Sequence, residues 1–238
     1  MLGPLINSAA LLAGGGIGAV LSARLPARVR EALPLTCGIL SIGIGVVMVN
    51  KVRTIPAVTL AMLAGAFVGE LLWLERGLER AIQWLQTVAQ RFIRTAGEGA
   101  HTQNFVHKYI TLLVLFCVSG MGIFGAMHEG MTGEASILMT KAVLDLFTAA
   151  IFATELGIAV ALIAIPQAAI QSALFFGANL LVPLVSPGMQ ADFSACGGLI
   201  MLATGMRICG IKVFPIVNML PALVLVMPIS ALWLRFMG

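Results

Sequence analysis

The sequence has 238 residues, of which 60% are hydrophobic and 10% are charged, and its mean hydropathy is +1.03. So few polar side chains cannot cover a soluble globular protein of this size, so the composition predicts an integral membrane protein. The net charge of +4 comes from residues that lie between apolar runs, a distribution typical of membrane topology signals and not of nucleic-acid binding. The four cysteines lie inside apolar stretches without a CxxC motif, so we expect no metal site, disulfide or cofactor.

Eight apolar segments follow one another, each close to the length of about 20 residues that a bilayer crossing needs. In chain order they cover residues 4–23, 33–50, 54–74, 108–127, 136–154, 156–185, 193–209 and 214–236. The first has no positively charged leader, so we expect it to be retained as a helix. The fifth and sixth are the least clearly divided, because no polar loop separates them. The sequence therefore predicts one all-α polytopic transmembrane bundle, residues 1–238, with about eight crossings and with seven as the alternative.

The basic residues predict the orientation of this bundle. Arg24, Arg28 and Arg30 follow the first segment, and Arg76, Arg80, Arg91 and Arg94 follow the third. By the positive-inside rule both loops face the cytoplasm. With eight crossings, both termini lie outside, together with an acidic loop that carries Glu129 and Glu134. Lys51 and Arg53 in the second loop are exceptions to the rule.

The stretch 75–95 has a different pattern from the transmembrane segments. Leu78, Ile82 and Leu85 recur at helical spacing, and arginine, glutamate and glutamine fill the opposite face. This pattern predicts a cytoplasmic amphipathic helix, which either lies on the inner leaflet or pairs with a second copy of itself. A polar connection follows it, so that residues 75–107 form a unit between two groups of crossings.

Similar short motifs occur in the same order near the two ends of the chain. Thr36-Cys37-Gly38-Ile39-Leu40 leads through glycines and basic residues to Ile55-Pro56, and Ala195-Cys196-Gly197-Gly198-Leu199 leads in the same way to Phe214-Pro215. We interpret residues 1–74 and 156–238 as two copies of a three-helix unit, joined through linking helices at 108–154. Five crossings precede the second copy, so it is inverted, as in many secondary transporters. The alternative is that apolar helices rich in small residues resemble one another by composition alone.

The glycines of the second and seventh segments occupy corresponding places in the two copies. They allow either close contact between helices or interrupted helices whose free backbone groups bind a solute. The sequence alone leaves both possibilities open.

Charged and amide side chains inside the apolar segments are the candidates for function, because an ionisable group at membrane depth is costly and needs a partner or a task. The spacing i,i+4 places Lys141 and Asp145 on one face of the fifth segment, either as a proton-responsive or substrate-binding pair or as a structural ion pair. The predicted substrate-binding residues are Asn7, Gly38, Ser41, Gly43, Gly45, Lys141, Asp145, Gln167, Gln171, Asn179, Gly198, Thr204, Gly205 and Asn218. The predicted coupling or gating residues are Lys141, Asp145, Glu70 and Arg207.

Four stretches carry a resemblance to a known family: MLGPLINSAALLAGGGIGA, CGILSIGIG, KAVLD at 141–145 and ADFSACGGLIMLATGMRICGIKVFPIVNMLPAL. With these stretches the whole chain resembles the YqgA/YdfK-type bacterial membrane proteins, a domain family of unknown function whose members are labelled as transporters or membrane proteins. The resemblance implies a multi-spanning protein of the bacterial inner membrane and supplies no substrate.

Transport of a small polar solute is the leading functional hypothesis. A proton or cation drives it, and the lipid bilayer and the solute or ion are the partners. HExxH and GxGD motifs are absent from the sequence, so we do not expect an enzyme. The alternatives are a channel-like pore formed by a homo-oligomer and a non-transporting scaffold or sensor that acts through the amphipathic helix.

Overall fold

The computed structural model describes residues 1–21, 27–95 and 100–237, and within these ranges the chain forms helices and no strand. The helices are α1 (Leu2–Leu21), α2 (Ala27–Val49), α3 (Ile55–Leu71), α4 (Leu74–Thr95), α5 (Ala100–Cys117), α6 (Gly120–Thr132), α7 (Ser136–Leu156), α8 (Ala159–Leu162), α9 (Ala164–Asn179), η1 (Val182–Leu184), α10 (Pro187–Ile208), α11 (Ile216–Met219) and α12 (Pro221–Met237). Arg24 and the side chains of Arg30, Arg91 and Arg94, on which the predicted orientation rests in part, lie outside the described residues. The all-α class is confirmed.

Local sequence signals explain where several helices begin and end. The Ser119 and Ser186 side chains accept hydrogen bonds from backbone N–H groups at the starts of α6 and α10, which satisfies donors that a helix start leaves free. Gly133 ends α6 with φ 76°, and Gly157 ends α7 with φ 64°. A side chain at either position would be strained, because only glycine adopts such angles without a steric penalty.

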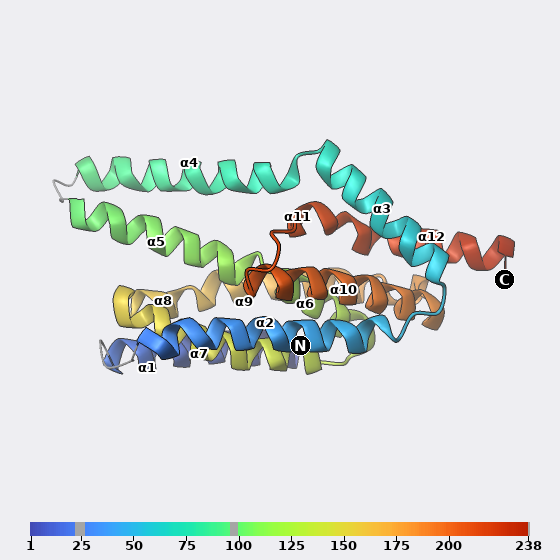
Figure 1. Cartoon of the computed structure of the whole chain (residues 1–238), viewed down its shortest axis with the longest axis horizontal. Coiled ribbons are helices and arrows are strands. Elements are labelled where there is room, and N and C mark those ends of the chain that lie inside the picture. The colour runs from blue at the N-terminus through green and yellow to red at the C-terminus, as the bar shows by residue number, and fades with distance from the viewer. Residues whose placement is uncertain (22–26, 96–99, 238) are drawn as a thin grey trace.

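The long helices pack in pairs through small residues. A Cβ atom on Gly14 of α1 would lie 2.2 Å from the Leu146 carbonyl oxygen of α7, and one on Gly65 of α3 would lie 2.4 Å from Ala222 Cα of α12. Close approach of this kind is how helices associate when lipid removes the hydrophobic driving force between them. The numbering along the contacts shows that α1 runs parallel to α7 and that α3 runs antiparallel to α12. Figure 1 shows α1, α2, α7 and α10 as neighbouring rods of the main bundle.

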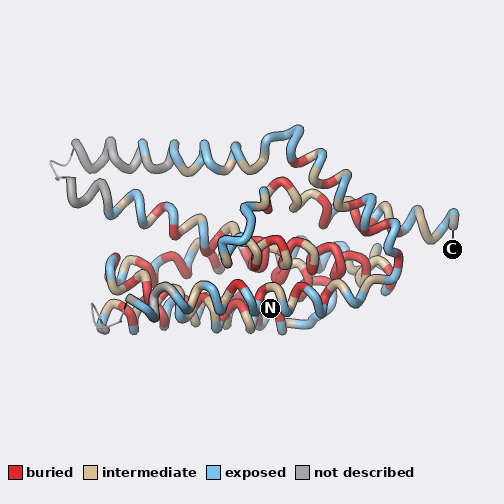
Figure 2. Tube along the Cα trace, in the orientation of Figure 1, coloured by how far each residue is buried: buried red, intermediate tan, exposed pale blue. Residues whose placement is uncertain are grey.

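Among the described residues, six helical stretches are long and apolar enough to cross a membrane, and there are seven if the bent pair α3 and α4 counts as one span. They include 105–132, which contains most of α5 and all of α6, and 159–184, which contains α8 and α9. Helix α10 is outside this set; Gln190, Asp192 and Arg207 dilute its apolar residues. Buried residues gather along α6 and α10, whereas α3 and the end of α12 carry more exposed ones (Figure 2). Large apolar side chains such as Leu63 and Phe67 on the outside of α3 suit contact with lipid.

The predicted amphipathic helix is present as α4, which lies beside α5 and extends away from the main bundle (Figure 1). It meets α3 at a bend of 43°, and Trp73 at the bend has φ 54°, an uncommon conformation for a bulky residue. The Arg76 guanidinium lies 3.8 Å from the centre of the Trp73 ring, a cation–π contact that holds the bend. The Trp84 side chain on α4 is 65% exposed.

Candidate solute site

The predicted pair Lys141 and Asp145 is buried near the middle of α7, with exposed fractions of 3% and 7%. The Lys141 ammonium donates to Asp145 Oδ2, and the amide of Gln167 on α9 donates to the same oxygen at 2.7 Å. Asp145 thus has one donor from its own helix and one from a neighbouring helix. Sequence spacing predicts the first contact but not the second, because only tertiary packing brings α9 to α7.

A helix break faces this pair. Helix α5 ends at Cys117 and α6 begins at Gly120, close to the middle of the apolar span 105–132. Ser119 caps the new helix by accepting a hydrogen bond from the Gly122 backbone N–H at 3.1 Å. Backbone groups left free by a break inside a span are tolerated only where protein or a polar cavity surrounds them, and here a cavity lined by Ser119 adjoins the break.

Gly122 is the point at which α6, α7 and α9 approach most closely at the break. A Cβ atom at this position would lie 2.8 Å from Ser119 Oγ, 3.0 Å from Lys141 Cε and 3.3 Å from Gln171 Nε2. The absence of a side chain therefore admits both the lysine and the glutamine to the start of α6.

A cavity of about 220 Å³ adjoins the pair. Its polar lining comes from three helices, α2, α7 and α10, and from the break: Cys37, Ser41, Ser119, Lys141, Asp145, Thr148 and Thr204. Apolar residues including Phe116 and Phe152 complete the wall. The cavity therefore brings together four of the predicted site residues from different parts of the chain: Ser41, Lys141, Asp145 and Thr204.

Buried amides near the centre of the bundle have unused hydrogen-bonding atoms. Both amide atoms of Gln171 and of Asn7, and Oε1 of Gln167, have no hydrogen-bond partner within the described part of the chain. Gln171 is 1% exposed. Because buried polar groups are normally paired, each such group calls for an explanation, of which a solute, ion or water is one.

A comparison with family models gives a match over residues 2–231 to a family described as "Protein of unknown function (DUF554)". The chain belongs to this family. It is 52% identical over 233 residues to the "Uncharacterized protein YqgA" of Escherichia coli strain K12, covering 98% of this chain and 97% of that protein. It is 23% identical over 246 residues to the "Uncharacterized membrane protein YdfK" of Bacillus subtilis strain 168, covering 99% and 100%. No solved structure matches the chain at a significant level. The apolar helices indicate a membrane protein, which is also how the name of the Bacillus subtilis relative describes that protein.

The glycines predicted to bind a solute lie at close contacts between α2 and α10, with the exception of Gly43. A Cβ atom on Gly38 would lie 3.0 Å from the Gly205 carbonyl oxygen, and one on Gly45 would lie 2.8 Å from that of Gly198. The reciprocal distances are 2.5 Å and 2.8 Å, so α2 and α10 cross antiparallel with their backbones in contact. Both helices are unbroken, so of the two possibilities that the sequence left open the structure shows close contact between helices. Gly43 is exposed and has nothing near it.

Other predicted residues lie outside the cavity. Asn179 is exposed at the end of α9. Glu70 and Asn218 meet at the junction of α3, α4 and α11, where the Asn218 amide donates to the Glu70 carboxylate and its oxygen accepts from the Glu75 backbone N–H at 2.7 Å. Arg207 joins the same cluster through an ion pair of 2.6 Å with Glu75. These bonds anchor α4 to the end of α10 and to α11, which is a structural role.

The sequence analysis missed one buried carboxylate, Asp192, and placed another, Glu129, in a loop. Asp192 of α10 is fully buried and accepts from the backbone N–H groups of Arg53 and Thr54 and from the Ser230 hydroxyl, at 2.9, 2.7 and 2.6 Å. Glu129, predicted in an outer acidic loop, lies within α6 and is 2% exposed, with the N-terminal amine of Met1 at 2.9 Å. A carboxylate near a helix start signals capping of this kind, but which helix it caps depends on the fold.

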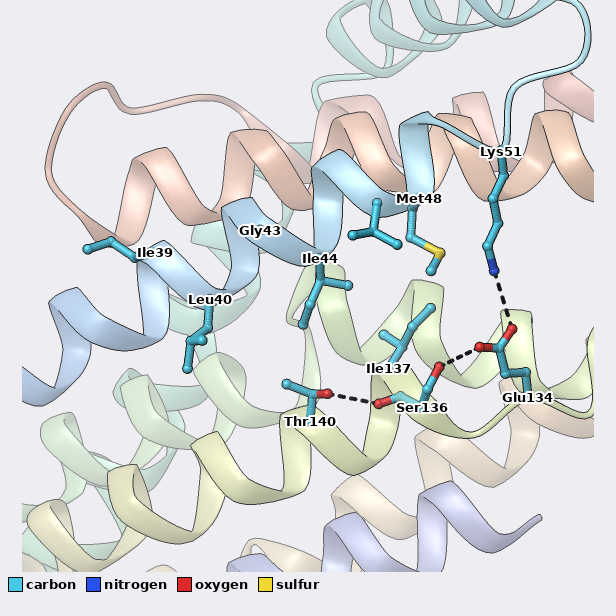
Figure 3. A pocket seen from close by; sticks show the side chains of 11 residues that line it. Ile39, Leu40, Gly43, Ile44, Met48, Lys51, Glu134, Ser136, Ile137 and Thr140 are labelled. Atoms are coloured by element: carbon cyan, nitrogen blue, oxygen red, sulfur yellow. Dashed lines mark hydrogen bonds and ion pairs between the residues drawn. The ribbon is translucent and has the colours of Figure 1, made fainter.

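An open groove of about 690 Å³ lies between α2 and α7 on the outside of the bundle. Its apolar walls include Ile39 and Ile44, and at one end Lys51 pairs with Glu134 at 3.3 Å (Figure 3). The Ser136 hydroxyl donates to Glu134 at 2.9 Å. This bond, with the nearby Lys51 ammonium as a smaller cause, lowers the pKa of Glu134 from its ordinary value. Lys51, an exception to the orientation rule, thus has an acidic partner.

Proposed function

We propose that this protein is a secondary transporter that moves a small polar solute across the bacterial inner membrane by alternating access. The observation that carries the proposal is the buried Lys141–Asp145 pair beside a helix break, a cavity and amides that have no partner. A purely structural ion pair would require none of the other three. Charged residues inside membrane segments generally mark ion or substrate pathways.

The arrangement of the helices supports alternating access. In the proposed inverted repeat, α1, α2 and α3 correspond to α9, α10 and α12, and α6 and α7 link the copies. The contacts follow such a scheme: α2 packs antiparallel on α10 and α3 antiparallel on α12, while α1 packs on α7 as α9 packs on α6. Eight crossings complete the proposal. A site at the interface of two inverted copies can open to either side when one copy rocks against the other.

The α2–α10 contact is suited to such rocking. Helices that meet backbone to backbone through glycines have few interlocking side chains, so small rotations change few contacts. The Ser41 hydroxyl, which donates to the Met201 carbonyl at 3.0 Å, is a cross-link between the two helices at this level. It lines the cavity as well, so movement of the copies would reshape the site.

Solute uptake into proteoliposomes tests the proposal. Removing one partner of a buried pair leaves an unpaired charge, at about 3–5 kcal/mol, so the main variant is the neutral double substitution Lys141→Gln with Asp145→Asn. We expect it to fold and to lose uptake. The matched control is Lys108→Gln with Glu155→Gln, which neutralises an exposed ion pair of 2.9 Å and retains uptake. Uptake that persists in the double variant at the α7 pair would exclude the site.

The same assay separates a pore from a transporter. A transporter saturates with solute concentration because each cycle requires binding and a conformational change, and a pore conducts in proportion to the gradient. Saturable uptake with counterflow supports alternating access, and linear flux supports the oligomeric pore.

A further inference from the structure

The charge balance of the cavity restricts what can bind there. Lys141 and Asp145 are the two charged residues that line it within the described part of the chain, and they neutralise each other. A charged solute that takes one of them as its partner leaves the other as an uncompensated buried charge, which is strongly unfavourable. Binding of a charged solute must therefore be linked to a proton or to a second ion of opposite charge.

The donors at the break favour an anion over a cation. Three sources of positive potential meet at Gly122: the Lys141 side chain, the Gln171 amide nitrogen and the start of α6. A helix of 13 residues such as α6 presents partial positive charge at its start, which attracts anions. Gln171 is the independent sign of a ligand, because it is almost fully buried, lies against this helix start and has no partner.

One oxygen of the acceptor side is already occupied, because Asp145 Oδ2 receives hydrogen bonds from both Lys141 and Gln167. A cation at Asp145 would lie beside the Lys141 ammonium and near the positive start of α6, and both repel it. Lys141 can instead turn toward an anion and leave Asp145 with its bond from Gln167.

We propose that the solute is a small monovalent anion that binds Lys141 beside the start of α6, and that a proton binds Asp145 in the same step. The inference rests on the proposed function and names its substrate class and coupling. The Asp145 carboxylate takes up the proton as Lys141 leaves it, so the total charge of the site is the same before and after binding. Anion and proton thus cross together, one for one.

The surroundings of Asp145 offer few competing proton acceptors. Within the described part of the chain, the titratable groups that face the pair from neighbouring helices are the thiols of Cys37 on α2 and Cys117 on α5. Helix α9 contributes the amides of Gln167 and Gln171, which do not titrate. The cavity volume of about 220 Å³ equals that of roughly seven water molecules at about 30 Å³ each, enough for an inorganic anion or a short carboxylate.

Thermal melting of the purified full-length protein tests anion binding apart from transport. Choline chloride, choline nitrate and choline lactate vary the anion, and sodium gluconate varies the cation. We expect at least one of the three choline salts to raise Tm, with an apparent Kd that weakens about tenfold per pH unit once Asp145 has lost its proton, because one proton is linked to one anion. Asp145→Asn imitates the protonated acid, so it binds the same anion independently of pH. Lys141→Gln with Asp145→Asn binds none, and Lys108→Gln behaves as the parent.

Proteoliposomes that contain a pH-sensitive dye then test the coupling. An inward gradient of the stabilising anion should acidify the lumen, with about one proton per anion, and neither Asp145→Asn nor the double variant should do so. Stabilisation by sodium gluconate, or failure of all three choline salts, would overturn the inference. In that case, saturable uptake of potassium or glycerol that the double variant abolishes would still leave the protein a transporter, whereas its absence would count against the proposed function as well.

Discussion

The glycine contact between α2 and α10 makes a sharp prediction for Gly45→Ala. The new Cβ atom would lie 2.8 Å from the Gly198 carbonyl oxygen and 2.9 Å from Leu202 N. Both of these atoms belong to the α10 backbone, so neither can move away by a side-chain rotation. Ordinary contact begins at 3.4 Å, so the helices must separate by about half an ångström over this crossing. Overpacking of this kind destabilises by about 1–3 kcal/mol.

The same helix offers a matched control two residues away. Nothing lies within 4 Å of a Cβ atom on Gly43. Alanine there removes backbone freedom from the unfolded chain and should be neutral or stabilise by up to about 1 kcal/mol. The two variants therefore make the same chemical change, and their effects on the free energy of unfolding are expected to differ.

Equilibrium unfolding in mixed micelles with increasing denaturing detergent measures the difference. We expect the midpoint for Gly45→Ala to fall and that for Gly43→Ala to stay or rise. The double variant Gly45→Ala with Gly198→Ala should lose less than the sum of its parts, because one separation of the helices relieves both clashes. Equal midpoints for the two single variants would refute the packing role of the glycines.

Three further predictions follow from other contacts. Gly122→Ala should abolish solute uptake with little loss of helix content, since its Cβ atom would lie 3.0 Å from Lys141 Cε; uptake and circular dichroism measure the two effects. Asp192→Asn should destabilise by about 1–3 kcal/mol, because backbone donors at the start of α3 lose a charged acceptor, and its detergent midpoint should fall. Carbon NMR of the Glu134 carboxyl should show a pKa below 4.5, and Ser136→Ala should raise it most. Because the folded pKa is lowered, the stability from the Lys51–Glu134 pair is present above pH 4.5 and disappears as the pH falls through that lowered value.

Composition and periodicity were sufficient for the class and for most helices. Charged residues mark many of the boundaries between helices because burying a charge in lipid is costly, but Glu129, predicted in a loop, lies within α6. The α4 helix followed from its two faces, and the Lys141–Asp145 contact from i,i+4 spacing. These features are local in sequence, which is why they could be predicted without a fold.

The location of the helix break could not be predicted in the same way. Glycine frequency pointed to the second and seventh segments, but glycine serves both breaks and close packing, and there it serves packing. The actual break at 118–119 has a weaker sign, a serine that can cap a helix, followed by Gly120 and Gly122. A serine inside an apolar run is common, so this pattern does not predict a functional break unless the fold shows that Lys141 lies beside it.

The two kinds of glycine together suggest how the fold divides its tasks. At Gly45 and Gly198 the missing side chains bring together two continuous helices whose backbone groups are all paired, so the contact is close and offers a solute nothing to bind. At Gly122 the missing side chain lies in the first turn of α6, where Ser119 caps the Gly122 N–H and the side chains of Lys141 and Gln171 from other helices lie close by. Movement at the first contact has to break or re-form the Ser41–Met201 hydrogen bond and few other side-chain contacts, and the second contact leaves polar atoms unpaired when no ligand is bound. A transport cycle needs both properties, a joint that moves and a site whose occupation changes the energy of the moving parts.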